Sequence, residues 1–209
     1  MTREGHQVTT PALPTPALPT SRDASLTAWA MAARSGDPEA VDHFVRALHR
    51  DVRRYVAYLG VDPQSADDLA QDTFLRALGS LHRFEGRSSA RAWLLAIARH
   101  AVIDSFRSAA ARPRPADFDD WRLAVERAQP RGLPGFDEGI ALDDLLAGLP
   151  EERREAFVLT QLLGLPYAEA ALVSDCPVGT VRSRVARART SLIASLSDAE
   201  RCGPADAAA

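Results

Sequence analysis

The residues best suited to chemistry in this sequence are four arginines in the stretch VGTVRSRVARAR, residues 178–189. No Asp or Glu occurs from Cys176 to Ser197, although the whole chain of 209 residues has a formal net charge of -3. A guanidinium group makes paired hydrogen bonds with phosphate oxygens and with the edge of guanine. We therefore expect this segment to bind DNA; the simpler alternative is a solvated basic surface.

A second group of polar residues is acidic. Asp67, Asp68, Gln71 and Asp72 fall on the polar side of a helix expected over residues 66–78, away from its apolar positions. Carboxylates gathered on one exposed helix face complement a basic protein surface. The pattern predicts a docking face for another protein.

The segment HRFEGRSSARAW, residues 82–93, combines arginines with aromatic residues. From Arg83 to Arg114 there are seven Arg against two acids, Glu85 and Asp104. Unpaired bases stack on aromatic rings while their phosphates contact guanidinium groups. With Phe84 expected at the surface, this segment predicts a site for single-stranded DNA.

Patterns typical of catalysis or of metal binding do not occur in the sequence. His43 and His49 are six positions apart, so they do not share a helical face as a ligand pair, and His82 and His100 lack partners at metal-binding spacing. No Walker A loop, HExxH motif or nucleophile motif is present. We expect no enzyme activity, cofactor, metal or small-molecule substrate.

Helices must position these residues, because no segment alternates with period two. A first helical stripe runs from Val41 to Leu59, and a second from Ala66 to Leu78 with Ser65 as the expected N-cap and Gly79 as its end. A third helix is expected over about 89–107. Further helices are expected at 141–148, 151–163, 167–173 and 178–196.

Composition divides this all-α chain into two small helical modules. The repeat PALPT at 11–15 and 16–20 predicts a disordered tail over residues 1–24, and proline with glycine predicts a flexible linker over 109–139. The first module covers 25–108 and the second 140–197, and residues 198–209 form a second tail. No apolar run is long enough to span a bilayer, so we expect a cytoplasmic protein.

The second module contains a helix-turn-helix at residues 167–186. A short helix, a turn from Ser174 to Pro177 and a basic second helix have the spacing of this motif, whose second helix enters the major groove. The expected core face consists of Val181, Val185, Ala188, Leu192 and Leu196. The expected DNA face consists of Thr180, Ser183, Arg184, Arg187 and Ser191, with Arg182 and Arg189 on its edges. We expect Arg184 or Arg187 to read a base edge and the two edge arginines to hold phosphates.

Three stretches in order carry a resemblance to a known family: ADDLAQDTFLRAL, then RFEGRSSARAWLLAIARHAVID, then LPEERREAFVLTQLLGLPYAEA followed by PVGTVRSRVARAR. Together they resemble the extracytoplasmic-function (ECF) sigma factors of the sigma-70 family, close to the sigma-C subgroup. The resemblance covers roughly residues 38–195. It implies a factor that binds core RNA polymerase and directs promoter-specific transcription initiation, with an anti-sigma factor as a further possible partner.

The resemblance assigns a role to each cluster. Residues 25–108 would be region 2, whose contacts with the polymerase β′ coiled coil would be Asp67, Asp68, Leu69, Gln71 and Asp72. Its residues for recognising and melting the -10 element would be Arg83, Phe84, Arg87, Ser88, Arg91 and Arg99. Residues 140–197 would be region 4, which contacts the β flap and reads the -35 element through Thr180, Arg182, Ser183, Arg184 and Arg187.

Two residues depart from the family pattern in the turn of the helix-turn-helix. Asp175 stands where Gly is usual and Ser174 where a core Leu is usual, so we expect a slightly looser turn with Asp175 in the left-handed conformation. Cys176 replaces a buried aliphatic residue and is expected to pack rather than to act as a redox switch.

Two alternatives to a sigma factor are a conventional helix-turn-helix regulator that binds DNA as a dimer, and a helical adaptor that binds only proteins. The first requires a second apolar stripe for dimerisation, which the sequence lacks, and the acid-free helix at 178–196 argues against the second. Promoter elements about 17 base pairs apart are separated by ~58 Å, at 3.4 Å per pair. The linker could reach ~100 Å when extended, and we expect the polymerase to hold the modules apart.

Overall fold

The structure is a computed structural model that describes residues 21–111, 142 and 144–201, and all the regular elements in these residues are helical. The first module comprises α1 (Ser21–Arg34), α2 (Pro38–Tyr58), α3 (Pro63–Ser80), the short 3₁₀ helix η1 (Leu81–Arg83) and α4 (Ala90–Ala111). The second comprises α7 (Glu151–Phe157), the π-helical turn η2 (Val158–Leu162), α8 (Tyr167–Val173) and α9 (Val178–Arg201). Residues 142 and 144–147 are also helical. The predicted all-α class is confirmed.

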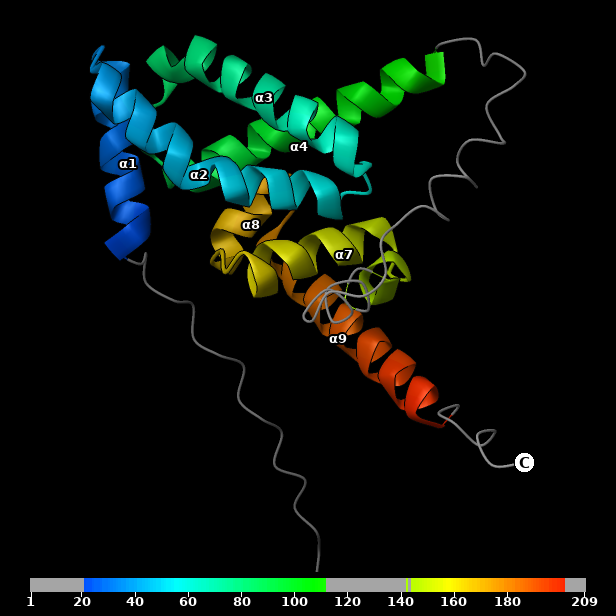
Figure 1. The fold of residues 1–209 in the computed structure, drawn as a ribbon. Helices are drawn as coiled ribbons and strands as arrows, with labels where there is room; N and C mark the ends of the chain where they lie inside the picture. Colours follow the sequence, from blue (N-terminus) through cyan, green and yellow to red (C-terminus); the bar gives the residue numbers. More distant parts are fainter. Residues whose placement is uncertain (1–20, 112–141, 143, 202–209) are drawn as a thin grey trace, which may run out of the picture.

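The two modules pack directly against each other. In Figure 1, α2, α3 and α4 lie together with α1 crossing their end, and α7, α8 and α9 lie beneath them. Helix α8 contacts both α4 and α9, and α2 contacts η2. Buried apolar side chains of both modules, such as Phe44 and Val52 in the first and Leu159 and Val173 in the second, form one continuous cluster. The modules therefore share a core in this structure.

Helix α1 was not expected from the sequence, which assigned residues 21–24 to the tail. Its buried face consists of Leu26, Ala30 and Ala33, and two of these are alanines that carry little apolar signal. The helix forms because this face packs against α2 and α4. At other boundaries, residues 109–111 continue α4 and residues 198–201 continue α9. The rest of the predicted tails and linker, residues 1–20, 112–139 and 202–209, lies outside the described residues, as do residues 140, 141 and 143 of the predicted second module.

Helix α3 begins earlier than expected, and the prediction that Ser65 is its N-cap is wrong. Asp62 is the N-cap, and its carboxylate accepts hydrogen bonds from the backbone N–H of Gln64 (3.1 Å) and of Ser65 (3.0 Å). Pro63 follows at the first helical position, where its fixed φ favours a helix and its missing N–H costs nothing. Hydrogen bonds from Ser65 lower the pKa of the Asp62 carboxyl, so it stays charged at the positive end of the helix dipole.

The helix-turn-helix has its expected boundaries: α8 spans Tyr167–Val173 and α9 begins at Val178. Asp175 has a φ of 48°, which confirms the predicted left-handed conformation in the turn. The Ser174 side chain is buried and its Oγ has no hydrogen-bond partner, so we expect it to stabilise the turn less than a leucine would. Cys176 packs against the core cluster as predicted.

Helix α9 buries Val181, Val185 and Ala188, and Leu192 is packed at the edge of the core. Leu196, which was expected on the core face, is 49% exposed. Figure 1 shows why, since the last turns of α9 extend past α7 and α8. None of the described helices is long and apolar enough to cross a membrane.

Replacing Asp62 with Ala should destabilise α3 by about 1 kcal/mol, because losing the cap leaves two backbone N–H groups without their acceptor. Ser65→Ala is the control, and it should cost less because the backbone N–H of Ser65 keeps its acceptor. Thermal unfolding of the three proteins followed by circular dichroism measures the difference. A larger loss for Ser65→Ala would restore Ser65 as the cap.

Candidate nucleic-acid and docking surfaces

The segment that joins η1 to α4, from Phe84 to Ala90 as the first residue of α4 (the 84–90 loop), presents a basic surface. Arg83, just before the loop, and Arg87, within it, are exposed, and Ser88 is half-buried. Arg87 pairs with Glu85 on the same loop. Arg83, Arg87 and Ser88 line a shallow hollow of 260 Å³ together with Phe84, Glu85 and Trp93. The hollow thus brings together four of the residues predicted to contact DNA: Arg83, Phe84, Arg87 and Ser88.

Phe84 does not present its ring to solvent, so the prediction of an exposed Phe84 is wrong. It is 3% exposed and packs against Trp93, with ring centroids 5.0 Å apart and ring planes at 42°. Trp93 is only partly buried and lines the hollow. The aromatic surface open to a ligand therefore belongs mainly to Trp93, with Phe84 beneath it. The pair of aromatics in RFEGRSSARAW was the signal for it.

Arg91 is also not available to DNA in this structure. Its side chain is buried, and its Nε donates to Asp51 Oδ2 on α2 at 2.8 Å. Its Nη1 lies 4.0 Å from Asp23 Oδ1 on α1. Asp51 occupies the buried side of α2, where a carboxylate needs a charged partner. Arg91 therefore holds helices together, and the prediction that it contacts the -10 element is wrong for this conformation.

Arg99 lies on α4 at the boundary between the modules. Its Nε donates to Glu155 Oε1 of α7 at 2.8 Å, and the same oxygen accepts from the Tyr55 hydroxyl of α2 at 2.7 Å. Burial, and then the charge of Glu155, raise the pKa of Tyr55 well above 10.0, so the hydroxyl stays protonated and donates. This contact could not be predicted from the sequence, because its members are separated by long stretches of chain.

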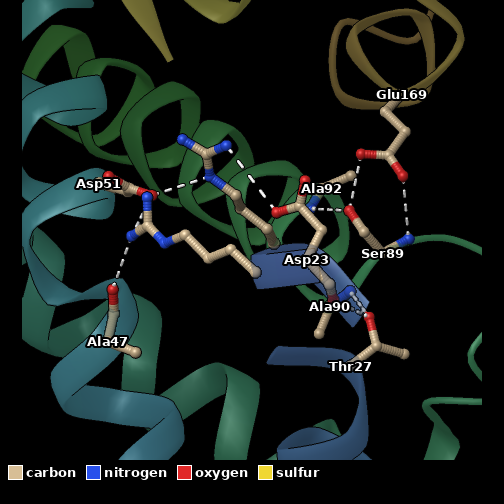
Figure 2. Close-up of polar contacts among 10 residues, drawn as sticks. Asp23, Thr27, Ala47, Asp51, Ser89, Ala90, Ala92 and Glu169 are labelled. Carbon is tan, nitrogen blue, oxygen red and sulfur yellow. Dashed lines mark hydrogen bonds and ion pairs between the residues drawn. The ribbon is translucent and has the colours of Figure 1, made fainter. Parts of the chain in front are cut away.

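A second polar contact joins the modules at the start of α4. Ser89 donates to Glu169 of α8 from its Oγ to Oε2 at 2.7 Å and from its N–H to Oε1 at 3.3 Å. The same Oγ accepts from the N–H of Ala92 at 3.1 Å, so Ser89 caps α4. Figure 2 shows Glu169 reaching down from α8 onto Ser89. The helix-turn-helix thus covers Ser89, beside the basic surface.

The acidic face predicted on α3 is present, and part of its charge is paired. Asp68 and Gln71 are exposed, and Leu69 packs partly into the core. Asp67 pairs with Arg53 of α2 at 2.6 Å, and Asp72 pairs with Arg76 at 2.8 Å. Such exposed pairs are weak and open readily to a better partner. Asp68 is therefore the member of this face with the most accessible charge.

The basic face of α9 is smaller than predicted. Arg182, Ser183 and Arg187 are exposed and Thr180 is half-buried. The prediction that Arg184 is exposed is wrong: its Nη2 pairs with Glu152 Oε2 of α7 at 2.6 Å, and its Nη1 lies 3.4 Å from the Cys176 sulfur. Arg184 is covered because α7 lies beside this face of α9, which the sequence did not predict.

Arg189, expected at the edge of the face to hold a phosphate, donates to Gln161 Oε1 at 2.6 Å. Among the described residues, no three His, Cys, Asp or Glu side chains gather as a metal-binding group.

These surfaces define a DNA-binding protein of two helical modules, one of them a helix-turn-helix. Residues 44–112 match the family model Sigma-70 region 2, and residues 140–192 match Sigma-70, region 4. The chain belongs to the sigma-70 family of RNA polymerase sigma factors.

Curated relatives place it among the ECF sigma factors. The chain is 49% identical over 174 residues to the ECF RNA polymerase sigma factor SigC of Mycobacterium tuberculosis and to the probable RNA polymerase sigma-C factor of Mycobacterium bovis, in each case over 83% of this chain and 92% of the relative. It is 36% identical to the ECF sigma factor EcfG of Rhodopseudomonas palustris, over 74% of this chain and 85% of the relative.

Solved structures give the same family. CnrH in complex with the cytosolic domain of CnrY is similar with a TM-score of 0.63 and 28% identity, over 83% of this chain and 98% of that one. The sigma factor RpoE in complex with the anti-sigma factor NepR from Bartonella quintana is similar with a TM-score of 0.57 and 25% identity, over 75% of this chain and 96% of that one.

Replacing Glu155 with Ala should loosen the contact between the modules. The change removes the acceptor shared by Tyr55 and Arg99, and leaving buried donors without an acceptor costs about 1–3 kcal/mol. Glu151→Ala is the matched control, because Glu151 is an exposed acid on the same helix. Small-angle X-ray scattering should give a larger radius of gyration for Glu155→Ala alone. Equal radii for wild type and both variants would show that Glu155 does not hold the modules together.

Proposed function

We propose that this sigma factor uses three separate surfaces to direct RNA polymerase to promoters. The observation that carries the proposal is the match of both sigma-70 regions in one chain, with an acidic face and a basic loop on the first and a helix-turn-helix on the second. Core RNA polymerase and promoter DNA are the partners that these surfaces fit. The polymerase performs the chemistry, so the chain needs no catalytic residue of its own, and this role places it in the cytoplasm.

The acidic face of α3 is the proposed docking surface for the β′ coiled coil. Asp68 and Gln71 are exposed at its centre, and Asp67 and Asp72 exchange their intramolecular arginines for basic residues of the partner. Leu69 supports the face from below. Region 4 would contact the β flap through the second module.

The hollow beside the 84–90 loop is the proposed site for an unpaired -10 base. Arg83, Arg87 and Ser88 would contact the backbone of the strand, and a base would stack on the exposed part of Trp93. Arg99 would join them once the modules separate and Glu155 moves away. For the -35 element, Arg187 and Arg182 with Ser183 and Thr180 form the accessible surface of α9, and Arg184 becomes available only when it leaves Glu152.

An anti-sigma factor is a further proposed partner. The two similar solved structures are complexes, one with the cytosolic domain of CnrY and the other with the anti-sigma factor NepR. The likeness to this chain extends over most of both sigma factors.

Charge reversal at Asp68 tests the docking surface. Asp68→Arg should weaken binding to core RNA polymerase at least about tenfold, since a like charge at a complementary interface costs more than the 1.4 kcal/mol that a factor of ten requires. Asp42→Arg, a reversal of an exposed acid on α2, is the control and should bind normally. Co-purification with core polymerase measures the binding, and run-off transcription on genomic fragments then measures transcription initiation. Normal binding by Asp68→Arg would remove α3 as the docking face.

Alanine substitutions on α9 test the reading of the -35 element. Arg187→Ala should weaken promoter binding by the holoenzyme by ~1–3 kcal/mol and relax preference at one -35 position if Arg187 reads a base edge. Arg182→Ala should weaken all promoters alike and lower the salt slope by about one. Arg184→Ala should have a smaller effect than Arg187→Ala, because Glu152 holds this guanidinium. A larger loss of preference for Arg184→Ala would show that α9 turns or that Glu152 releases Arg184 on DNA.

A further inference from the structure

Helix α1 holds both ends of the 84–90 loop. Arg34 donates from Nη1 to the carbonyl oxygen of Phe84 at 3.1 Å, where the loop begins. Thr27 accepts at Oγ1 from the backbone N–H of Ala90 at 3.1 Å, where the loop ends and α4 begins. The two contacts come from one helix that lies outside the residues matched by the region 2 family model.

The spacing along α1 suits this role. Thr27 and Arg34 are seven positions apart, so they lie on the same side of the helix and about 10 Å apart along its axis. Met31 lies between them on that side, with its sulfur 3.8 Å from the position that a Cβ on Gly86 would take. Gly86 itself has a φ of 70°, a conformation that side chains disfavour. Helix α1 therefore runs beneath the loop from its first residue to its last.

The contact at Ala90 replaces a bond that α4 cannot make internally. Ala90 is the first residue of α4, and the first N–H groups of a helix have no partner within it. The Thr27 hydroxyl donates its own proton to the carbonyl oxygen of Asp23 at 2.9 Å, which leaves a lone pair for Ala90. Figure 2 shows Thr27 beside Ala90, with Ser89 next to it.

Helix α1 is itself anchored to the body of the module by charges. Asp51 of α2 accepts from Arg91 of α4 at 2.8 Å and from Arg22 of α1 at 3.4 Å. Arg22 also donates to the carbonyl oxygen of Ala47 at 3.3 Å. Asp23 of α1 also lies 4.0 Å from the buried Arg91 guanidinium, so α1 cannot shift without losing its contacts with both members of the Asp51–Arg91 pair.

We propose that α1 is a positioning element for the 84–90 loop. Thr27 and Arg34 hold this loop in the shape that an unpaired DNA strand requires. The inference rests on the proposed role of this loop at the -10 element. A loop fixed at both ends loses less conformational entropy on binding than a free one. Arg83, Arg87 and Trp93 then meet the strand already arranged around the hollow.

The test compares side chains that keep or remove the Thr27 acceptor. Thr27→Val removes the hydroxyl at nearly constant shape, and Thr27→Ser keeps it. Arg34→Ala removes the contact at the other end of the loop, and Arg46→Ala, an exposed arginine on α2 that pairs with Asp42, is the matched control. Each variant is assembled with core polymerase. Open-complex formation is then measured on a duplex promoter and on the same promoter with its -10 region already unpaired.

Thr27→Val and Arg34→Ala should slow opening of the duplex promoter about three- to tenfold, the effect of one lost hydrogen bond. Both should be near normal on the unpaired template and in core binding. Thr27→Ser and Arg46→Ala should match wild type. Hydrogen exchange of the Ala90 amide should be faster in Thr27→Val than in Thr27→Ser, which reports the contact directly.

Duplex opening at the wild-type rate in both Thr27→Val and Arg34→Ala would overturn the inference. Equal losses on the two templates, accompanied by a lower unfolding temperature, would also overturn it, because they would assign α1 a purely structural role. If the wild-type holoenzyme gives no run-off transcript, the proposed function fails instead. A wild type that transcribes beside unaffected variants leaves the function intact and rejects only the positioning role.

Discussion

The buried ion pair between Asp51 and Arg91 is the interaction on which the first module depends. A carboxylate and a guanidinium taken out of water are tolerated only when they pair closely, and here they meet at 2.8 Å with both side chains buried. The pair joins α2 to α4, and Arg22 and Asp23 bring α1 to the same point. Removing either partner would leave an uncompensated charge inside the module, so the relative placement of these helices is strongly determined. The position of the 84–90 loop follows from it, since the loop leads directly into α4.

Much of the helical framework could be predicted from the sequence, and the misses have physical causes. The boundaries of α8 and the start of α9 follow from a turn with Asp175 and Pro177 between two strongly patterned helices, and the structure agrees. Helix α1 was missed because its buried side is mainly alanine, whose stabilisation comes from close packing rather than from a strong apolar signal. Asp62 rather than Ser65 is the cap of α3, because Pro63 takes the first helical position and the residue before it then accepts from the first free N–H groups.

The site residues show a similar division. The clusters on α3, on the 84–90 loop and on α9 were found, because each is local in sequence and depends on one helix face or one loop. Exposure of individual members was harder to predict, since it depends on neighbours far along the chain. Phe84 is covered by its own loop and Trp93, Arg91 by Asp51, and Arg184 by Glu152 of another helix. Arginine in particular serves both as a DNA ligand and as a partner for buried acids, and the residue type alone does not distinguish the two.

The hydrogen bonds between Ser89 and Glu169 have a thermodynamic consequence for the two modules. Ser89 lies in the 84–90 loop and caps α4, and Glu169 lies on the first helix of the helix-turn-helix. A ligand that binds the 84–90 loop or the helix-turn-helix only when the modules are apart must supply the free energy to break this contact and the one at Glu155. Once a first ligand has separated the modules, the second no longer bears that cost and binds more tightly. Linkage makes the gain reciprocal, so the two surfaces enhance each other's affinity by the same factor whichever is occupied first.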